Sequence, residues 1–202
     1  MHRTTIILFA LAISLALPRG AGVVHAGPQE NVNDAKVAAV HAAFLVNFLR
    51  YVKWPEAALG DAGSSLRIVV IGGDHFGSAL DAALKDKAIQ NRGVIARRLT
   101  LAPPGPDSGS PWPEESMTMV RGAHILYLEP VDASIRDAVL RVVKDLPVLT
   151  VSHVSDFARN QGMIGLVIRD GKVAFEVHRK RLEAAGLKAS AKLLDLADIV
   201  GD

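Results

Sequence analysis

The chain has 202 residues, of which 50% are hydrophobic and 22% charged, and it contains no cysteine. These values are those of a globular protein with enough length for one domain and a substantial core, and they exclude a fold held by disulfides. The formal net charge is +2, but residues 1–26 hold two arginines and no acid, so residues 27–202 carry equal numbers of basic and acidic side chains. Nucleic acid is therefore not expected as a partner.

Residues 1–26 have the pattern of a secretory signal peptide. A basic start precedes an apolar run from Thr4 to Leu17, and Val24 and Ala26 supply the small side chains that precede a cleavage site. The apolar run is too short to span a membrane. We therefore expect cleavage near Ala26-Gly27, export to the periplasm, and a mature chain that does not itself span the membrane.

A long helix is expected at the start of the mature chain. Its apolar positions recur at helical spacing, namely Val37, Val40, Phe44, Phe48 and Val52. Asn33 or Asp34 is expected to cap its start. The pair Trp54-Pro55 is expected to end it, because proline disfavours helix at the preceding residue.

Apolar runs of strand length then alternate with helical stretches. We expect strands at Leu66–Ile71, Gly93–Leu99, Ala123–Leu128 and Pro147–Val151, and helices at Phe76–Leu84 and Ala133–Lys144. Residues 101–116 are rich in proline, glycine and serine, so they are expected to form a surface loop.

The C-terminal part closes the domain. Met163–Val177 predicts two strands joined by a tight turn at Asp170-Gly171. Helices should follow at Arg179–Ala185 and after the capping residue Ser190, the last with Leu193, Leu196 and Val200 on one face. Strands separated by helices imply an α/β fold, with a mainly parallel mixed sheet covered by helices on both faces, an antiparallel C-terminal hairpin and closing helices. Residues 27–202 are thus expected to form a single domain.

The segment VLTVSHVSDF, residues 148–157, places Ser152, His153 and Asp156 within five positions. A hydrolase triad is not expected here, because the chain has no G-x-S-x-G motif and neighbours on a strand end project in different directions. We interpret the segment as a strand leading into a turn, with Ser155 and Asp156 at the start of a short helix. No catalytic residue is assigned, and the protein is expected not to be an enzyme.

Four segments, taken in order, resemble the YfiR/HmsC-like family of periplasmic proteins. They are AAFLVNFLRYVKWP (42–55), LRIVVIGGDHFGSALDAAL (66–84), LTVSHVSDFARNQGMIGLVIRDGKVAFEV (149–177) and AAGLKASAKLLDLADIV (184–200), and the match covers roughly residues 36–200. Two places depart from the family pattern. His153 stands where the family usually has aspartate, and HRKR at 178–181 replaces a more neutral segment.

The resemblance implies regulation by binding, without catalysis. Proteins of this family restrain an inner-membrane diguanylate cyclase by engaging its periplasmic sensor domain, which lowers cyclic-di-GMP output and biofilm formation. An outer-membrane lipoprotein can withdraw the restraint, and members form homodimers. We expect the same partners here. Redox control through paired cysteines is not expected, because the chain has none.

Residues at two strand ends suggest a small-molecule site. Gly73 and Asp74 lie between a strand and a helix, where the backbone can form either an anion-binding turn or a simple tight turn. His75 and His153 both follow apolar strands, and parallel strands would bring both to the edge where α/β proteins place ligands. No cofactor or metal is expected, because the mature histidines contain no H-x-H or H-x-x-x-H pair.

Candidate partner-binding residues lie at the end of the first helix and near the C-terminus. Trp54 stands at a helix end, where an aromatic side chain can be half exposed, although core packing is its default. The basic residues Arg179, Arg181, Lys188 and Lys192 form either a solvated face or a surface that attracts an acidic patch on a partner.

Two functions of different classes therefore stay open. The favoured one is a periplasmic regulator that acts through protein–protein contact. The alternative is a periplasmic small-molecule-binding module, with its ligand at the C-terminal edge of the parallel strands near Gly73, His75 and His153.

Overall fold

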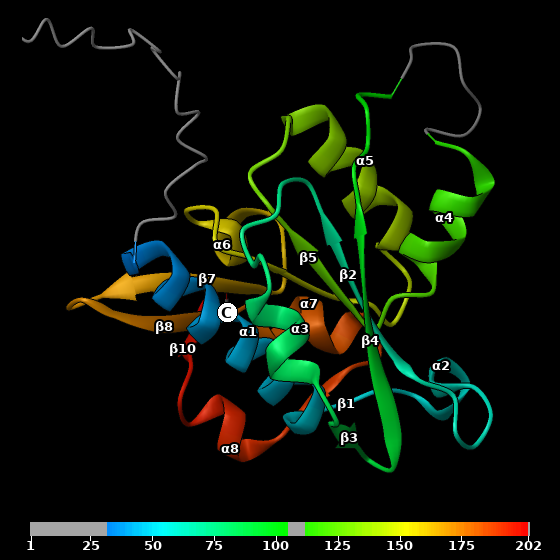
Figure 1. Ribbon diagram of the computed structural model, residues 1–202, viewed down its shortest axis with the longest axis horizontal. Coiled ribbons are helices and arrows are strands. Elements are labelled where there is room, and N and C mark those ends of the chain that lie inside the picture. Colours follow the sequence, from blue (N-terminus) through cyan, green and yellow to red (C-terminus); the bar gives the residue numbers. More distant parts are fainter. Residues whose placement is uncertain (1–31, 105–111, 202) are drawn as a thin grey trace, which may run out of the picture. The chain divides into compact units, whose positions relative to one another are not determined.

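An eight-stranded sheet organises residues 32–104 and 112–201, the ranges that the computed structural model describes (Figure 1). Its strands lie in the order β10 (Asp198–Ile199), β8 (Lys172–Val177), β7 (Ile164–Arg169), β6 (Leu149–Ser152), β5 (Ile125–Leu128), β2 (Leu66–Ile71), β4 (Arg92–Leu99) and β3 (Ala88–Ile89). The signal peptide expected at residues 1–26 lies outside the described ranges.

Most neighbouring strands are parallel. The run from β4 through β2, β5 and β6 to β7 is parallel throughout, and β8 pairs parallel with β10. β7 and β8 form an antiparallel hairpin that turns at Asp170 and Gly171, both of which have positive φ. The short edge strand β3 runs antiparallel to β4. The expected mainly parallel mixed sheet with a C-terminal hairpin is confirmed.

The central strands are covered on both faces, which explains their continuous apolar sequences. Every residue of β5 and β6 is buried. Alternate residues of β2 and β5 belong to two separate cores: Ile68, Val70 and Tyr127 to the first, and Val69, Ile71, Leu126 and Leu128 to the second. Two cores separated by one sheet require helices on both sides of it.

Helices cover both faces, as expected. α1 (Val32–Tyr51) and α3 (Ala79–Leu84) pack together on the first core, to which α7 (Arg179–Ala184) and α8 (Ala191–Leu194) also contribute. α4 (Glu114–Arg121), α5 (Ala133–Val143) and α6 (Phe157–Asn160) contribute to the second core. In Figure 1, α1 and α3 lie on the near side of the sheet.

Two short strands tie the C-terminal segment to the end of α1. β1 (Val52–Lys53) follows α1 directly and pairs antiparallel with β9 (Lys188–Ala189). α2 (Glu56–Leu59) begins just after the Trp54-Pro55 pair. Within the part of the chain that is described, no helix combines the length and apolarity needed to cross a membrane.

Several local expectations differ from the structure, and three of them change how a segment is described. α1 begins at Val32, so Asn33 and Asp34 lie in its first turn and do not cap it. α4 begins at Glu114, inside the range expected as a surface loop, and its two buried residues are too few to produce a clear helical pattern. The expectation of one apolar face after Ser190 is wrong, because α8 ends at Leu194 and leaves Leu196 70% exposed.

Candidate functional site

The carboxyl ends of β2, β5 and β6 lie at one edge of the sheet, because these strands are parallel neighbours. Each strand is followed by an ionisable side chain, His75 after β2, Glu129 after β5 and His153 after β6. α1 contributes His41 from its buried side. Side chains from four separate stretches of the chain therefore meet at this edge.

Three imidazole rings form a cluster there, which we call the histidine cluster and which consists of His41, His75 and His153. His41 Nδ1 lies 2.9 Å from His75 Nε2. The rings of His75 and His153 stack with their centroids 4.8 Å apart, and the centroids of His41 and His153 are separated by 5.6 Å. One ring nitrogen from each histidine lies within 4.8 Å of the other two.

Tyr127 and Glu129 add two polar groups beside the histidine cluster. Tyr127 Oη lies 2.7 Å from His153 Nδ1 and 3.3 Å from His41 Nδ1. Glu129 is only 3% exposed, and its Oε2 lies 3.9 Å from His153 Nδ1. Its Oε1 is buried without a hydrogen-bond partner. A buried carboxylate oxygen without a partner is costly unless a cation or a donor balances it.

Burial dominates the electrostatics of this group. Together with the neighbouring histidines, it lowers the pKa of His41 to about 3 and that of His153 to about 4. Burial also lowers the pKa of His75, against the opposing effect of Asp34 and Asp74. The imidazoles are therefore neutral at pH 7, the form that binds metal ions. Burial raises the pKa of Glu129 to about 7, against the effect of the His75 backbone amide, and it raises the pKa of Tyr127 as well.

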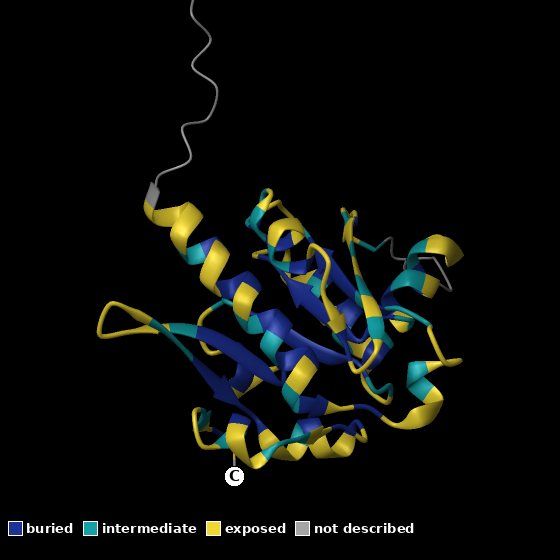
Figure 2. Ribbon diagram, turned by 60° about the horizontal axis from the view of Figure 1, so that its bottom comes forward, coloured by how far each residue is buried: buried dark blue, intermediate teal, exposed yellow. Residues whose placement is uncertain are grey.

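A pocket of about 420 Å³ opens beside the histidine cluster, and we call it the edge pocket. Its lining consists of Val37, His41, His153, Ser155, Asp156 and the β7 residues Leu166, Val167 and Ile168. The tip of the β7–β8 hairpin beyond it is exposed, as Figure 2 shows, and Ile168 is 62% exposed. Small solutes can therefore reach His41 and His153 through this pocket.

Gly72 lets the loop after β2 pass close to Glu129. Its φ is +115°, a conformation that residues with a Cβ rarely adopt. A Cβ at this position would lie 2.7 Å from Glu129 Cβ and 2.8 Å from Val131 Cγ1. The close approach places His75 and Glu129 at the same edge.

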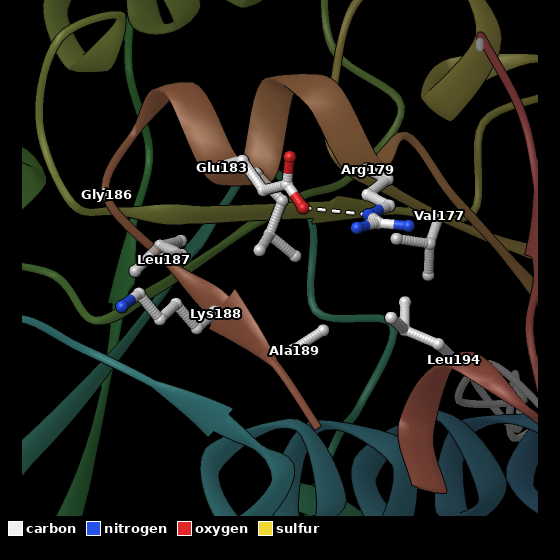
Figure 3. Close-up of a pocket in the computed structure, with 9 residues that line it drawn as sticks. Val177, Arg179, Glu183, Gly186, Leu187, Lys188, Ala189 and Leu194 are labelled. Atoms are coloured by element: carbon white, nitrogen blue, oxygen red, sulfur yellow. Dashed lines mark hydrogen bonds and ion pairs between the residues drawn. The ribbon is translucent and has the colours of Figure 1, made fainter. Parts of the chain in front are cut away.

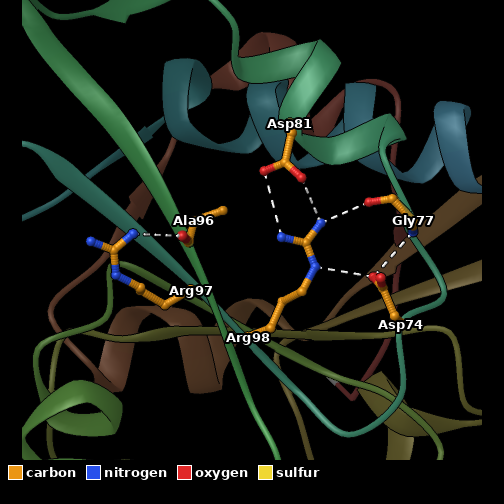
Figure 4. Close-up of polar contacts among 6 residues, drawn as sticks. All are labelled: Asp74, Gly77, Asp81, Ala96, Arg97 and Arg98. Atoms are coloured by element: carbon orange, nitrogen blue, oxygen red, sulfur yellow. Dashed lines mark hydrogen bonds and ion pairs between the residues drawn. The ribbon is translucent and has the colours of Figure 1, made fainter.

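The four residues expected to bind a ligand divide into two pairs. His75 and His153 come together in the histidine cluster, whereas Gly73 and Asp74 do not join it. Asp74 accepts a hydrogen bond from the Gly77 amide and forms an ion pair with Arg98 at 3.0 Å, as Figure 4 shows. Arg98 also pairs with Asp81 at 2.9 Å. Asp74 thus links the loop to β4 and α3.

The Ser152, His153 and Asp156 group does not assemble as a triad. Ser152 Oγ donates to the Leu128 carbonyl at 2.6 Å and accepts from the Val154 amide at 3.1 Å, so it holds the strand end. His153 Nδ1 faces Tyr127. Asp156 is exposed and lies in the left-handed region without a side-chain cap bond, and α6 begins after it.

The sequence patterns did not indicate three members of the site, namely His41, Tyr127 and Glu129. A usable signal existed for His41, since it lies at helical spacing between Val37 and Phe44 on the apolar side of the expected helix. A histidine on the buried side of a helix needs a polar partner in the interior, so its position indicated a buried polar site. Tyr127 and Glu129 carry weaker signals, because a tyrosine within a strand and an acid just after one are both common.

The candidate partner-binding residues lie in different environments. Trp54 is 7% exposed and belongs to the first core, so its side chain is not offered to a partner. Arg181 donates to the carbonyls of Ala158 and Gly162 at 2.8 and 3.1 Å. Lys188 and Lys192 are exposed, and Lys192 Nζ lies 5.4 Å from the centroid of the Tyr51 ring.

Arg179 and Lys188 border a second cavity of about 350 Å³, which we call the C-terminal pocket. Its walls are largely apolar and are formed by Val177, Leu182, Leu187, Ala189 and Leu194, with Glu183 and Gly186 completing the lining. Figure 3 shows Arg179 paired with Glu183 at one end and Lys188 at the other. Two of the four basic residues that the sequence singled out, Arg179 and Lys188, therefore lie at the ends of an apolar hollow.

The fold has a partial likeness among solved structures. An ABC domain from Streptococcus pneumonia in complex with L-Trp aligns with 79% of this chain, at 11% sequence identity and a TM-score of 0.49. The alignment covers 60% of that domain's own length. A comparison with curated proteins gives no match.

The comparison with protein families identifies the family of this chain. The YfiR/HmsC-like family model matches residues 38–198, so the chain belongs to this family. Its members are periplasmic proteins that repress diguanylate cyclases. The matched range contains all five residues of the histidine cluster and its surroundings, from His41 to His153.

Proposed function

We propose that the protein is a periplasmic negative regulator that binds the periplasmic sensor domain of an inner-membrane diguanylate cyclase and thereby lowers cyclic-di-GMP output and biofilm formation. The observation that carries this proposal is the family match over residues 38–198. The regulator acts by binding and catalyses no reaction. An outer-membrane lipoprotein releases the repression, and the working form is a homodimer.

The C-terminal pocket is the surface that we assign to the cyclase. Apolar walls surrounded by charge are typical of transient interfaces, in which the rim charges steer the encounter more than they add affinity. Lys188 lines the pocket and is exposed, and Lys192 is exposed on α8, the helix that contributes Leu194 to the lining. We leave Trp54 and Arg181 out of this surface, because Trp54 is buried and Arg181 donates hydrogen bonds to backbone carbonyls.

Deletion of the gene tests the function. Cyclic-di-GMP and surface attachment should rise in the deletion strain and return to the parental level when the gene is restored. Unchanged second-messenger levels under conditions in which the protein is expressed would refute the regulatory proposal.

Binding tests the assigned surface separately. The purified mature protein should bind the cyclase's periplasmic domain, and Lys188→Glu and Lys192→Glu should weaken that binding at low salt and less at high salt. Lys87→Glu makes the same charge change at an exposed position after α3 and should leave the affinity unchanged. Equal losses in all three variants would show only a net-charge effect.

The edge pocket supports a second candidate function, a periplasmic small-molecule-binding module. Its position at the carboxyl ends of the parallel strands is the place where α/β folds bind ligands. Under this alternative, deletion leaves cyclic-di-GMP unchanged, whereas small molecules from periplasmic extract co-purify with the protein.

A further inference from the structure

Three histidines from different parts of the chain converge beside a solvent-reachable pocket. One nitrogen of each lies within 4.8 Å of the other two, and His41 Nδ1 and His75 Nε2 are already 2.9 Å apart. We propose that His41, His75 and His153 bind a divalent transition-metal ion of the zinc class. This inference rests on the geometry of the cluster and is independent of the proposed regulatory function.

The spacing fits a tetrahedral ion. Zinc–nitrogen bonds of about 2.0–2.1 Å at tetrahedral angles separate the ligand nitrogens by roughly 3.3 Å. The nitrogens of His41 and His75 lie slightly closer than that, and the largest separation within the cluster is within 4.8 Å. Formation of the site requires side-chain rotations that shorten the longer separations to roughly 3.3 Å. The ligands come from α1, the loop after β2 and the end of β6, which the sheet holds in place.

The donor set selects the class of metal. Three imidazole nitrogens suit Zn²⁺, Cu²⁺ and Ni²⁺, whereas Mg²⁺ and Ca²⁺ require oxygen ligands. Three protein ligands leave a fourth position for water or another small ligand, as in zinc sites that bind substrate. The edge pocket, which borders both His41 and His153, provides the space for that fourth ligand.

Tyr127 and Glu129 supply the surroundings that such a site needs. Histidines that ligate a metal usually hold their other nitrogen against a carboxylate or another polar group, which fixes the orientation of the ring. Tyr127 Oη engages Nδ1 of His153, so we assign Nε2 of that ring as the coordinating atom. Glu129 offers a buried carboxylate 3.9 Å from the same Nδ1, with one oxygen that has no hydrogen-bond partner. A bound cation beside it would favour the ionised form of this carboxyl group.

The other explanation is a packed histidine cluster with no affinity for metals. Stacking of His75 on His153 and the hydrogen bond between His41 and His75 are compatible with it. It gives no reason for three rings from separate elements to converge beside a pocket, whereas the metal site does. Titration of the protein with zinc distinguishes the metal site from a packed histidine cluster.

The experiment uses the mature protein without a polyhistidine tag, stripped with a chelator and titrated with zinc chloride. We expect one zinc ion per chain by native mass spectrometry, with micromolar or tighter affinity by calorimetry, and a higher midpoint of thermal unfolding when zinc is present. Co²⁺ should give the visible absorption bands of a tetrahedral nitrogen site, a readout that requires no variant. Mg²⁺ should produce neither effect.

Variants locate the ion. His75 and His153 are partly exposed, so His75→Ala and His153→Ala should fold. Each removes a direct ligand and should weaken zinc binding by more than about 100-fold, the upper end of the loss expected when only an orienting partner is removed. His124→Asn is the matched control, because His124 lies outside the cluster and asparagine keeps an acceptor for the Arg67 amide. Its zinc affinity should equal that of the parent. If the tag-free parent shows no saturable zinc binding, or if both alanine variants bind as tightly as the parent, the proposal is wrong.

Discussion

Tyr127 Oη and His153 Nδ1 lie 2.7 Å apart, although 26 residues separate them in the chain. The contact follows from the pairing of β5 with β6, in which Tyr127 lies opposite Val151 and Leu128 opposite Ser152. The residue that follows β6 is thereby brought over the tyrosine. Tyr127 also reaches His41 on α1, so a single hydroxyl connects the helix to the strand edge.

Removal of that hydroxyl tests the connection. Tyr127→Phe removes the hydrogen-bond partner of His153 Nδ1 in a buried setting, whereas His41 Nδ1 keeps His75 Nε2 at 2.9 Å. We therefore expect the free energy of unfolding to fall by about 1–3 kcal/mol. Urea denaturation measures it. Tyr51→Phe makes the same change at the partly buried end of α1 and should have a smaller effect. Equal losses would show that the Tyr127 hydroxyl contributes nothing specific.

The adjacent glycines Gly72 and Gly73 should respond differently to substitution by alanine. Gly72→Ala forces a Cβ into a positive-φ position and against Glu129, so we expect a loss of roughly 2–4 kcal/mol in the free energy of unfolding. Gly73→Ala meets no atom within 4 Å and should be nearly neutral. Thermal unfolding of the two variants side by side decides this prediction. If Gly73→Ala is the more damaging, the loop does not run as described.

The strand ends were predictable from the sequence, whereas the complete cluster was not. Leu66–Ile71 was expected as a strand and is one, so the positions of His75 and His153 just beyond their strands followed from parallel pairing. His41 reaches them only because α1 packs on that face with a particular rotation about its axis. Such packing depends on shape complementarity over the whole core, which local spacing does not encode.

The partner of Asp74 could not be predicted from the sequence either. Its position after a strand suggested anion binding by the neighbouring backbone, yet its carboxylate pairs with Arg98, a residue of the adjacent strand β4. Partners across parallel strands depend on strand order, and the order β5-β2-β4 could not be read from the succession of strands along the chain. α4 was not predicted for a different reason. It buries only Met117 and Val120, and two apolar positions are too few to show a helical pattern in the sequence.

Protonation of His124 should contribute a pH-dependent loss of stability. It is 1% exposed and accepts a hydrogen bond from the Arg67 amide. Burial first, and then the nearby cations of Arg67 and Arg92, lower its pKa to about 4 against the opposing effect of the Ala58 backbone. Because the folded-state pKa lies below the unfolded value of about 6.5, this contribution to stability is complete above pH 6.5 and is lost as the pH falls toward 4, at about 1.4 kcal/mol per pH unit.

The variant His124→Asn isolates that contribution. Asparagine does not titrate, so the free energy of unfolding should fall less steeply between pH 6.5 and pH 4 in the variant than in the parent, whatever its value at pH 7. Chemical denaturation at several pH values gives both slopes. Parallel curves for parent and variant would mean that His124 does not resist protonation in the folded protein.

Leu193 and Leu196 make a matched pair near the C-terminus. Leu193 is buried in the first core, so Leu193→Ala should cost about 2–5 kcal/mol. Leu196 is exposed, so Leu196→Ala should change stability by no more than about 0.5 kcal/mol. Thermal or urea unfolding distinguishes them, and a similar cost for both would place Leu196 in the core.

Arg181 and Lys188 carry the same charge and should differ in what they stabilise. The Arg181 guanidinium donates to the carbonyls of Ala158, Gly162 and Asn160 at 2.8, 3.1 and 3.2 Å, and it thereby ties α7 to the segment around α6. Arg181→Glu removes these donors and places a carboxylate against carbonyl oxygens. We expect a loss of roughly 2–4 kcal/mol in the free energy of unfolding.

Lys188→Glu, on the exposed side of β9, should change the free energy of unfolding by no more than about 0.5 kcal/mol. The two reversals alter net charge equally, so urea denaturation at low and high salt separates a specific structural role from a general electrostatic one. If the cost at Arg181 disappears at high salt, its carbonyl contacts do not hold α7, and Arg181 returns to the set of candidate partner-binding residues together with Lys188.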